Sequence, residues 1–376
     1  MALGLRVAGW VTAFFRHNER ICWGPRLAKH DGARGQTDQA VGAYSEYKRL
    51  ADRLVALEPD NLKWRMEGLY GVENSGISLF NKRRFAEAGR QFESALGPMQ
   101  NLVAVDPANP TYQKELPKVL AWRSDAERVQ GHLDSAIAAR SRQIALLDQA
   151  IARGASDVDL REQLIIAHQA FGLLLTSRGQ SDQGIQELRS AVAQADNLIP
   201  IEPANAQWKR SAARARLYLA NALLWAGQHD EASRQTENAC NILAGLPPDG
   251  SANSIRTFCL TMRSRLALES GANADALALA QQALKSAGQV HSEDPLKDRF
   301  IIASIYRLIG DSRRAMGDNE SAKGAWMNAL PFLPPKGVET PTEMDEHAVI
   351  LERLGRTAES RPLVARLQAI GFQRTN

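Results

Sequence analysis

The chain has few of the residues from which catalytic and metal centres are built. Its 376 residues include three cysteines and seven histidines, and no two histidines stand three or four positions apart, as metal ligands on one helix would. It contains no Gly-x-x-x-x-Gly-Lys-Ser/Thr, Gly-x-Gly-x-x-Gly, Gly-x-Ser-x-Gly or His-Glu-x-x-His motif. We therefore expect no catalytic residue, cofactor or metal, and we expect that the chain is not an enzyme.

Cysteine is too scarce for a disulfide-rich fold. Cys22, Cys240 and Cys259 are odd in number and follow no spacing motif, which favours a reducing compartment and a cytoplasmic location. Cys240 and Cys259 flank a Leu-Pro-Pro-Asp-Gly stretch, so a hairpin there would allow them to face each other. We favour buried free thiols, because an unpaired cysteine commonly behaves as a small core residue.

The chain also lacks a surplus of charge of one sign. Lysine and arginine number 46 and acidic residues 42, and the first 35 residues alone account for the net charge of +4. The remaining residues are balanced, so they lack the basic stripe with which proteins neutralise phosphates along a nucleic acid. We therefore expect no nucleic-acid partner.

No apolar run reaches the ~20 residues of a membrane-spanning helix. Residues 1–24 form an irregular apolar and basic segment, and its apolar part is short and carries Arg6. We favour a capping helix or tail that covers the first repeat. The alternative is weak membrane association through residues 1–20, with Trp10 and Phe14 in the lipid interface, which would make the chain membrane-associated.

Glycine recurs along the chain at a nearly regular interval. Glycines recur at multiples of 48 residues, with Arg83 at the one missing position, and later glycines follow at intervals of 44, 46 and 38. A fixed period in this range is typical of a repeat array. Glycine adopts positive φ freely, so each is predicted to mark the turn of a helical hairpin. These turn glycines are Gly35, Gly131, Gly179, Gly227, Gly271, Gly317 and Gly355.

Small residues keep the same register. Alanine, glycine or serine stands seven residues before and five residues after every turn position. Apolar residues recur at steps of three and four, as in Phe85, Ala88 and Phe92, which predicts amphipathic helices on both sides of each turn. The small residues are expected to let the two helices of a hairpin approach closely.

The junctions between hairpins repeat as well. Asn61, Asn109, Asp157 and Asn205 are predicted N-caps. Three residues after each stands a large apolar side chain that is expected to pack between adjacent hairpins; these are Trp64, Tyr112, Leu160 and Trp208.

The pattern resembles the tetratricopeptide repeat, most clearly in Gly76, Ala88, Phe92 and Ala95. These copies are longer than the usual ~34 residues. They are similar to the long-period arrays attached to some bacterial signalling proteins. The resemblance implies an all-α fold, a right-handed α-solenoid of about eight antiparallel helix pairs over residues 25–370. Residues 371–376 are expected to be a C-terminal tail, the final helix pair a polar-faced end cap, and residues 245–253 the place of a possible kink.

In tetratricopeptide arrays the first helix of each pair lines a concave face. Counting back thirteen, ten, nine and six positions from the turns gives a row with aromatic, amide and basic side chains. Aromatic residues and arginine dominate binding hot spots. The alternative is that the aromatics pack between neighbouring first helices; we favour a groove. The predicted partner-binding residues are Tyr70, Asn74, Lys118, Trp122, Arg214, Tyr218 and Asn221.

Two functions follow as hypotheses. The first is a protein–protein interaction scaffold or adaptor that binds a peptide or helix in the groove. The second is a regulatory or sensor module of a membrane-tethered bacterial signalling system, associated with a kinase or cyclase, whose catalytic part is absent. The two-carboxylate clamp of the family is not reproduced in adjacent repeats, so recognition of a peptide C-terminus is not implied.

Overall fold

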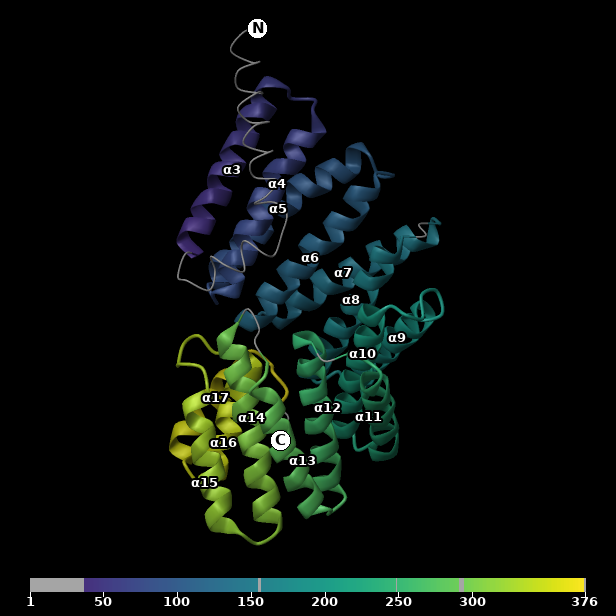
Figure 1. The fold of residues 1–376 in the computed structure, drawn as a ribbon. Coiled ribbons are helices and arrows are strands. Elements are labelled where there is room, and N and C mark those ends of the chain that lie inside the picture. The colour runs from purple at the N-terminus through teal and green to yellow at the C-terminus, as the bar shows by residue number, and fades with distance from the viewer. Residues whose placement is uncertain (1–36, 155–156, 248, 291–293, 375–376) are drawn as a thin grey trace. The chain divides into compact units, whose positions relative to one another are not determined.

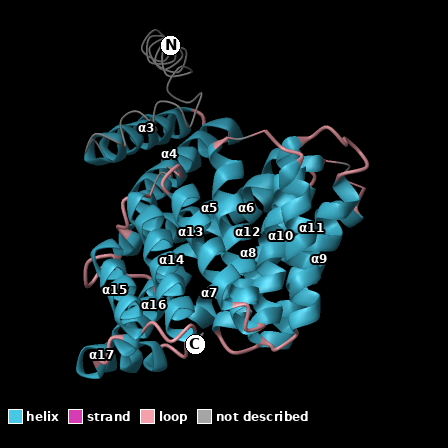
Figure 2. Ribbon diagram, turned by 60° about the horizontal axis from the view of Figure 1, so that its bottom comes forward, coloured by secondary structure: helices cyan, strands magenta, loops and turns pink. Residues whose placement is uncertain are grey.

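The computed structural model describes residues 37–154, 157–247, 249–290 and 294–374. These residues form helices joined by short loops, and no strand occurs among them (Figure 1 and Figure 2). The all-α prediction is therefore confirmed. The first 36 residues, which include Gly35, the expected cap and the alternative membrane segment, lie outside the described residues.

The helices follow one another as successive pairs. Their bounds are α3 Thr37–Leu57, α4 Leu62–Asn81, α5 Phe85–Val105, α6 Pro110–Gln130, α7 Leu133–Ala152, α8 Val158–Ser177, α9 Ser181–Leu198, α10 Ala206–Trp225, α11 His229–Ala244, α12 Gly250–Glu269, α13 Asn273–Ala287, α14 Pro295–Ala315, α15 Asn319–Ala329, the 3₁₀ helix η1 Leu330–Phe332, α16 Pro341–Arg353 and α17 Thr357–Ala369. By the period, even-numbered helices from α4 onward are first helices of their pairs and odd-numbered ones are second helices.

The chain divides into two compact units within α6. Unit 1 is Met1–Glu127 and unit 2 is Arg128–Asn376. Each is described separately below. Our expectation of one solenoid over residues 25–370, with a possible kink near 245–253, stays a prediction.

The turns lie where the glycine period places them. Every turn glycine of the described residues has positive φ, from 72° at Gly227 to 87° at Gly131 and Gly179. Arg83 stands at the position without glycine and adopts the same region at φ 58°, the one such non-glycine residue among those described. The turn geometry is thus kept even where the side chain disfavours it.

The small residues meet at the crossing of each helix pair. In unit 2 the α8–α9 pair gives the clearest case: a Cβ added to Gly172 would lie 2.7 Å from the backbone oxygen of Gly184 and 2.6 Å from Leu188. Alanines at the matching positions, such as Ala220 and Ala232, are fully buried. The prediction that small residues allow close approach is confirmed.

The predicted N-caps are also confirmed. The side-chain oxygens of Asn61, Asn109, Asp157 and Asn205 each accept a hydrogen bond from a backbone N–H in the first turn of the following helix. At the third residue after the cap, Trp208 is 5% exposed and its indole N–H donates to Glu162.

The first helices of unit 2 contact one another in succession. α8 contacts α10, α10 contacts α12, α12 contacts α14, and α14 contacts α16. Successive second helices make at most marginal contact in the described part of the unit. Because the first helices are predicted to line a concave face, we call the exposed side of α8, α10, α12, α14 and α16 the inward face.

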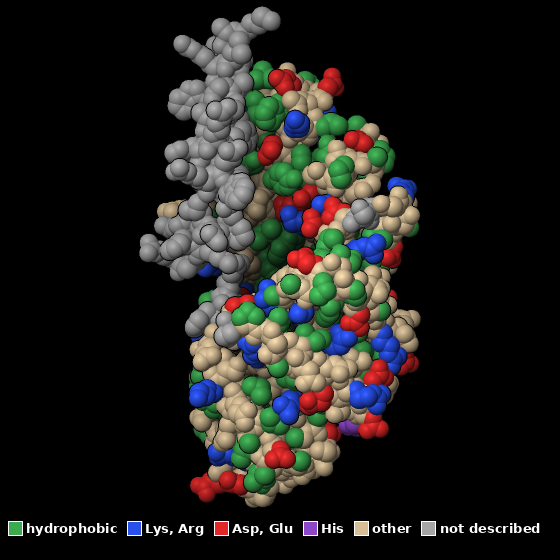
Figure 3. Space-filling model, turned by 45° about the vertical axis from the view of Figure 1, so that its right-hand side comes forward, with side chains coloured by type: hydrophobic (Ala, Val, Ile, Leu, Met, Phe, Trp, Pro, Cys, Tyr) green, Lys and Arg blue, Asp and Glu red, His purple; other side chains and the backbone are tan. Residues whose placement is uncertain are grey.

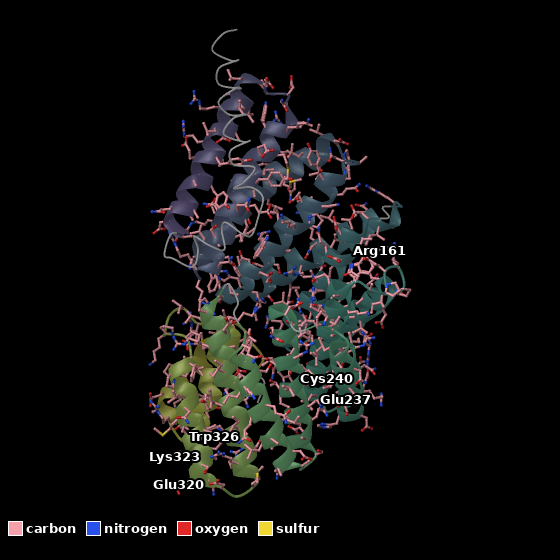
Figure 4. All side chains as sticks on the ribbon, viewed as in Figure 1. Arg161, Glu237, Cys240, Glu320, Lys323 and Trp326 are labelled. Carbon is pink, nitrogen blue, oxygen red and sulfur yellow. A yellow bond between two sulfur atoms is a disulfide. The ribbon has the colours of Figure 1, made fainter. Side chains whose placement is uncertain are left out.

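Cys240 on α11 and Cys259 on α12 are joined by a disulfide, with their Cα atoms 5.9 Å apart (Cys240 is labelled in Figure 4). Our preference for free thiols is therefore wrong. Arg256 of α12 holds the preceding loop and the end of α11. Its guanidinium donates to the carbonyls of Leu243 and Leu246 at 3.1 and 2.5 Å. This holds the start of α12 against the end of α11. The expectation of a reducing compartment, drawn from the number and spacing of the cysteines, stays a prediction.

The last helix pair, α16–α17, packs against the N-terminal helices of unit 2, α7 and α8. Leu363, Leu367 and Phe372 share a buried cluster with Leu133 and Leu174. The backbone N–H of Gln373 donates to the carbonyl of Ser177 at 2.7 Å, and Arg178 donates to the carbonyl of Gly371 at 3.2 Å. The expected end cap with a polar outer side stays a prediction; on its other side α16–α17 closes unit 2 on α7 and α8, and residues 371–373 take part in the closure.

Candidate binding surface

In unit 1, Tyr70 and Lys118 belong to a polar cluster between α4 and α6. The ammonium group of Lys118 lies 2.9 Å from a carboxylate oxygen of Glu73 and 3.3 Å from Glu115. Burial raises the pKa of Glu73, which is 3% exposed, and the charge of Lys118 opposes that shift. Burial lowers the pKa of Lys118, but the two carboxylates outweigh it and the net shift is upward. The lysine is therefore charged and already paired.

The phenol of Tyr70 adjoins this cluster. Burial, reinforced by the charge of Glu115, raises its pKa to about 12. An ordinary tyrosine titrates near pH 10. The unfolded chain therefore loses this proton first, and Tyr70 contributes stability that is present below pH ~10 and is lost as the pH rises toward 12.

We expect an alkaline titration, followed by the ultraviolet absorbance of tyrosinate, to include the ionisation of the Tyr70 phenol near pH 12. Tyr70→Phe should remove this late step and leave the rest of the curve unchanged. Tyr218→Phe, in unit 2, is the control and should retain it. A late step that survives in Tyr70→Phe would contradict the assignment.

The other two predicted residues of unit 1 are engaged within the unit. The amide nitrogen of Asn74 donates to the carbonyl of Tyr70, one turn earlier, at 2.8 Å. The indole of Trp122 stacks on Phe92, with ring centroids 5.7 Å apart, and meets the edge of Phe80 at 5.6 Å. The contact with Phe80 of α4 matches the alternative in which aromatics pack between neighbouring first helices, whereas Phe92 belongs to α5, a second helix. That unit 1 binds a partner through these residues stays a prediction.

In unit 2, the predicted residues Arg214, Tyr218 and Asn221 lie on α10. Arg214 is half-buried and has no hydrogen-bond or ion-pair partner among the described residues. Tyr218 packs against Phe258 of α12, with ring centroids 5.5 Å apart, which matches the alternative in which aromatics pack between neighbouring first helices. The side-chain oxygen of Asn221 accepts a hydrogen bond from Arg265 of α12. These three residues therefore share one stretch of the inward face.

Sequence reasoning missed Arg265 and Trp225. The Arg265 guanidinium lies over the Trp225 ring, 5.6 Å from its centroid, and Trp225 is 39% exposed. The signal was present: Arg265 stands six residues before Gly271, as Asn221 stands six before Gly227. Extending the row of inward positions past the fifth copy would have found Arg265. Trp225 falls outside that row.

Further along the inward face the charges satisfy one another. Asp311 of α14 accepts hydrogen bonds from Arg307 at 3.0 Å, from Arg353 of α16 at 2.9 Å and from the indole of Trp326 at 3.2 Å (Trp326 is labelled in Figure 4). Arg307 also pairs with Glu346 at 2.5 Å. This part of the face is a structural network that joins α14, α15 and α16.

The α8–α10 end of the inward face also differs from the α14–α16 end in exposing large apolar side chains. Ile166 of α8, a predicted inward residue, is 51% exposed. Trp225 of α10, the neighbouring first helix, is the second large apolar side chain exposed on this part of the face. We call Ile166, Arg214, Tyr218, Trp225 and Arg265 the inward patch.

On the face drawn in Figure 3, acidic and basic side chains of the described residues are interspersed. Within the described chain, no three His, Cys, Asp or Glu residues gather as metal ligands would. None of the described helices combines the length and apolar character that a bilayer crossing requires.

Comparison with known proteins finds likeness in structure alone: no family model and no curated protein matches the chain. The apo form of RapI has a TM-score of 0.59 at 10% identity, over 97% of this chain and 99% of that one. A Rap protein complexed with competence and sporulation factor has a TM-score of 0.53 at 14% identity, over 86% and 80%.

A third solved structure makes the type of repeat explicit. It is a signal transduction ATPase with numerous domains from Pyrococcus horikoshii that has a tetratricopeptide repeat sensor, with a TM-score of 0.50 at 9% identity, over 89% of this chain and 47% of that one. Identities this low speak for the fold alone. The chain has the fold of the tetratricopeptide-type repeat solenoids.

Proposed function

We propose that the chain is a protein-interaction scaffold that binds a peptide or helix on the inward patch of unit 2. One observation carries the proposal: exposed apolar side chains, an aromatic pair and an arginine without a partner lie together on three adjacent first helices. Exposed aromatic and arginine side chains are the residue types that anchor protein interfaces. The Rap conjugation gene regulator of plasmid pLS20, solved in complex with the Phr* peptide, has a TM-score of 0.51 at 13% identity and supports a peptide partner for this kind of fold.

The alternative is a sensor or regulatory module of a bacterial signalling system, tethered to a membrane and associated with a kinase or cyclase. The Pyrococcus horikoshii protein supports it, because its repeat array is described as the sensor of a signalling ATPase. The two proposals share the inward patch and differ in what a bound partner controls. Neither includes a catalytic step in this chain, a cofactor or a nucleic acid.

An array of random peptides of about ten residues, each ~33 Å long when extended, would test binding directly. We expect unit 2 in the full chain to retain a subset of peptides. Arg214→Ala combined with Tyr218→Ala should reduce that signal about tenfold, as the loss of hot-spot side chains does. Arg234→Ala, on the exposed side of α11, is the matched control and should bind as the wild type does. Retention by the double variant at the wild-type level would exclude the inward patch as the binding surface.

A further inference from the structure

We propose that Arg265 binds an acidic side chain of the peptide or helix on the inward patch, so that the partner segment is acidic. This inference rests on the proposed function and specifies the chemistry of its partner. It concerns side chains of the partner, Asp or Glu, at the place where α10 and α12 meet.

Arg265 is held in position by two neighbours from α10. One guanidinium nitrogen donates to the side-chain oxygen of Asn221, and the central guanidinium carbon lies over the ring of Trp225, 5.6 Å from its centroid. A guanidinium has five N–H donors in a fixed fork that matches a carboxylate. The structure gives one of them a protein acceptor, so the others are available for a ligand. An arginine that is already oriented loses less side-chain entropy when it binds.

Comparable arginines of unit 2 already have a carboxylate. Arg307 pairs with Glu346 and Asp311, and Arg374 pairs with Asp345 and Glu352. Arg265 has no carboxylate within ion-pair distance among the described residues. Glu346 and Glu269 act on it through space, but Glu346 is committed to Arg307 at 2.5 Å.

The surroundings of Arg265 make an added anion favourable. Burial lowers the pKa of Arg265 to about 10, and the positive charge of Arg307 contributes in the same direction. The group therefore remains a cation at neutral pH but has lost hydration that a carboxylate would replace. A charge-assisted bidentate hydrogen bond is the strong form of this interaction.

Arg214 is the second cation of the inward patch, and the two cations are separated along the helix axis. Arg214 stands seven residues before Asn221 on α10, which is about 10 Å along the helix at 1.5 Å per residue. The Tyr218–Phe258 pair lies on α10 and α12 between these levels. The patch thus offers cation, aromatic pair and cation in sequence, which fits a segment with acidic residues on both sides of an apolar one.

The peptide array, sorted by peptide net charge at matched hydrophobicity, tests the inference. We expect acidic peptides to dominate the retained set. A retained acidic peptide, labelled and measured by fluorescence anisotropy, should bind Arg265→Gln about tenfold more weakly. Its analogue with Gln and Asn in place of Glu and Asp should bind the wild type about tenfold more weakly too.

Arg263→Gln is the matched control, because Arg263 lies two residues away on α12 and pairs at the exposed surface with Glu237 of α11. It should bind as the wild type does. Retained peptides without an acidic preference would overturn the inference and leave the scaffold proposal standing. Equal losses in Arg263→Gln and Arg265→Gln would also overturn it. An array that retains no peptide would overturn both proposals.

Discussion

Replacing Cys240 and Cys259 together by serine is expected to lower the free energy of unfolding of unit 2 by about 3 kcal/mol. The disulfide closes a loop with a sequence separation of 19 residues and joins the end of α11 to the middle of α12. Cross-linking restricts the unfolded chain, and the loss of that restriction accounts for the expected change. Urea unfolding of the wild type and the double variant, both without reductant, measures it.

Two controls make this result specific. Reductant should destabilise the wild type by a similar amount and leave the double variant unchanged. Non-reducing peptide mapping of the wild type should recover Cys240 and Cys259 in one cross-linked fragment. Recovery of both as free thiols, with no effect of reductant on unfolding, would show that the bond does not form in the protein.

Gly172→Ala is expected to destabilise unit 2 by about 2 kcal/mol, although alanine is the better helix former. The new methyl group would lie 2.7 Å from the backbone oxygen of Gly184, which has no rotamer through which to move away. The α8–α9 pair would have to separate, and Leu188 with it. Thermal and urea unfolding measure the loss.

Gly324→Ala provides the matched control. Gly324 lies within α15 and an added Cβ would meet no heavy atom within 4 Å. This variant should therefore be stabilised by roughly 0.5–1 kcal/mol, the ordinary gain of alanine over glycine in a helix. The prediction is that the same substitution has opposite signs at the two positions. A stabilising Gly172→Ala would show that the pair is less tightly packed than described.

The repeat architecture was predictable because its determinants are local. Gly131 and Gly179 mark turns through backbone conformation alone, and Asn205 caps a helix through atoms two and three residues away. Gly172 and Gly184 meet because both stand at fixed distances from the same turn. A period of 48 residues reports all of these features without any knowledge of how the pairs are stacked.

The closure of unit 2 was not predictable in this way. Whether Leu367 reaches Leu133 depends on the small rotation between successive pairs, summed over the whole unit. The 48-residue period breaks after Gly227, so no regular increment could be extrapolated. The row of arginines at the end of the chain indicated a polar outer side, and Arg361 and Arg366 are indeed exposed. The opposite side of α17, with Leu363 and Leu367, is the one that closes the unit.

The inward residues were also predictable only in part: their position on the helix was, and their contacts with other helices were not. Spacing placed Arg214, Tyr218 and Asn221 on one side of α10. It did not tell which inward side chains are already paired with, or packed against, side chains of neighbouring helices. Lys118 and Trp122 occupy equivalent positions in unit 1 and are paired or stacked. The difference lies in Glu73 and Phe92, which supply partners there, and it becomes visible only when side chains from separate helices are placed together.

The closure carries a consequence for how this protein can change in evolution. Open repeat arrays gain and lose whole helix pairs readily, because each pair needs a neighbour on only one side. The terminal pair simply moves outward when another pair is inserted before it. In unit 2 the contacts of Gln373 with Ser177 and of Phe372 with Leu174 fix the total rotation between the first and last helix pairs. A duplicated or deleted pair would leave a gap or an overlap at that seam, so the number of copies in unit 2 is set by geometry.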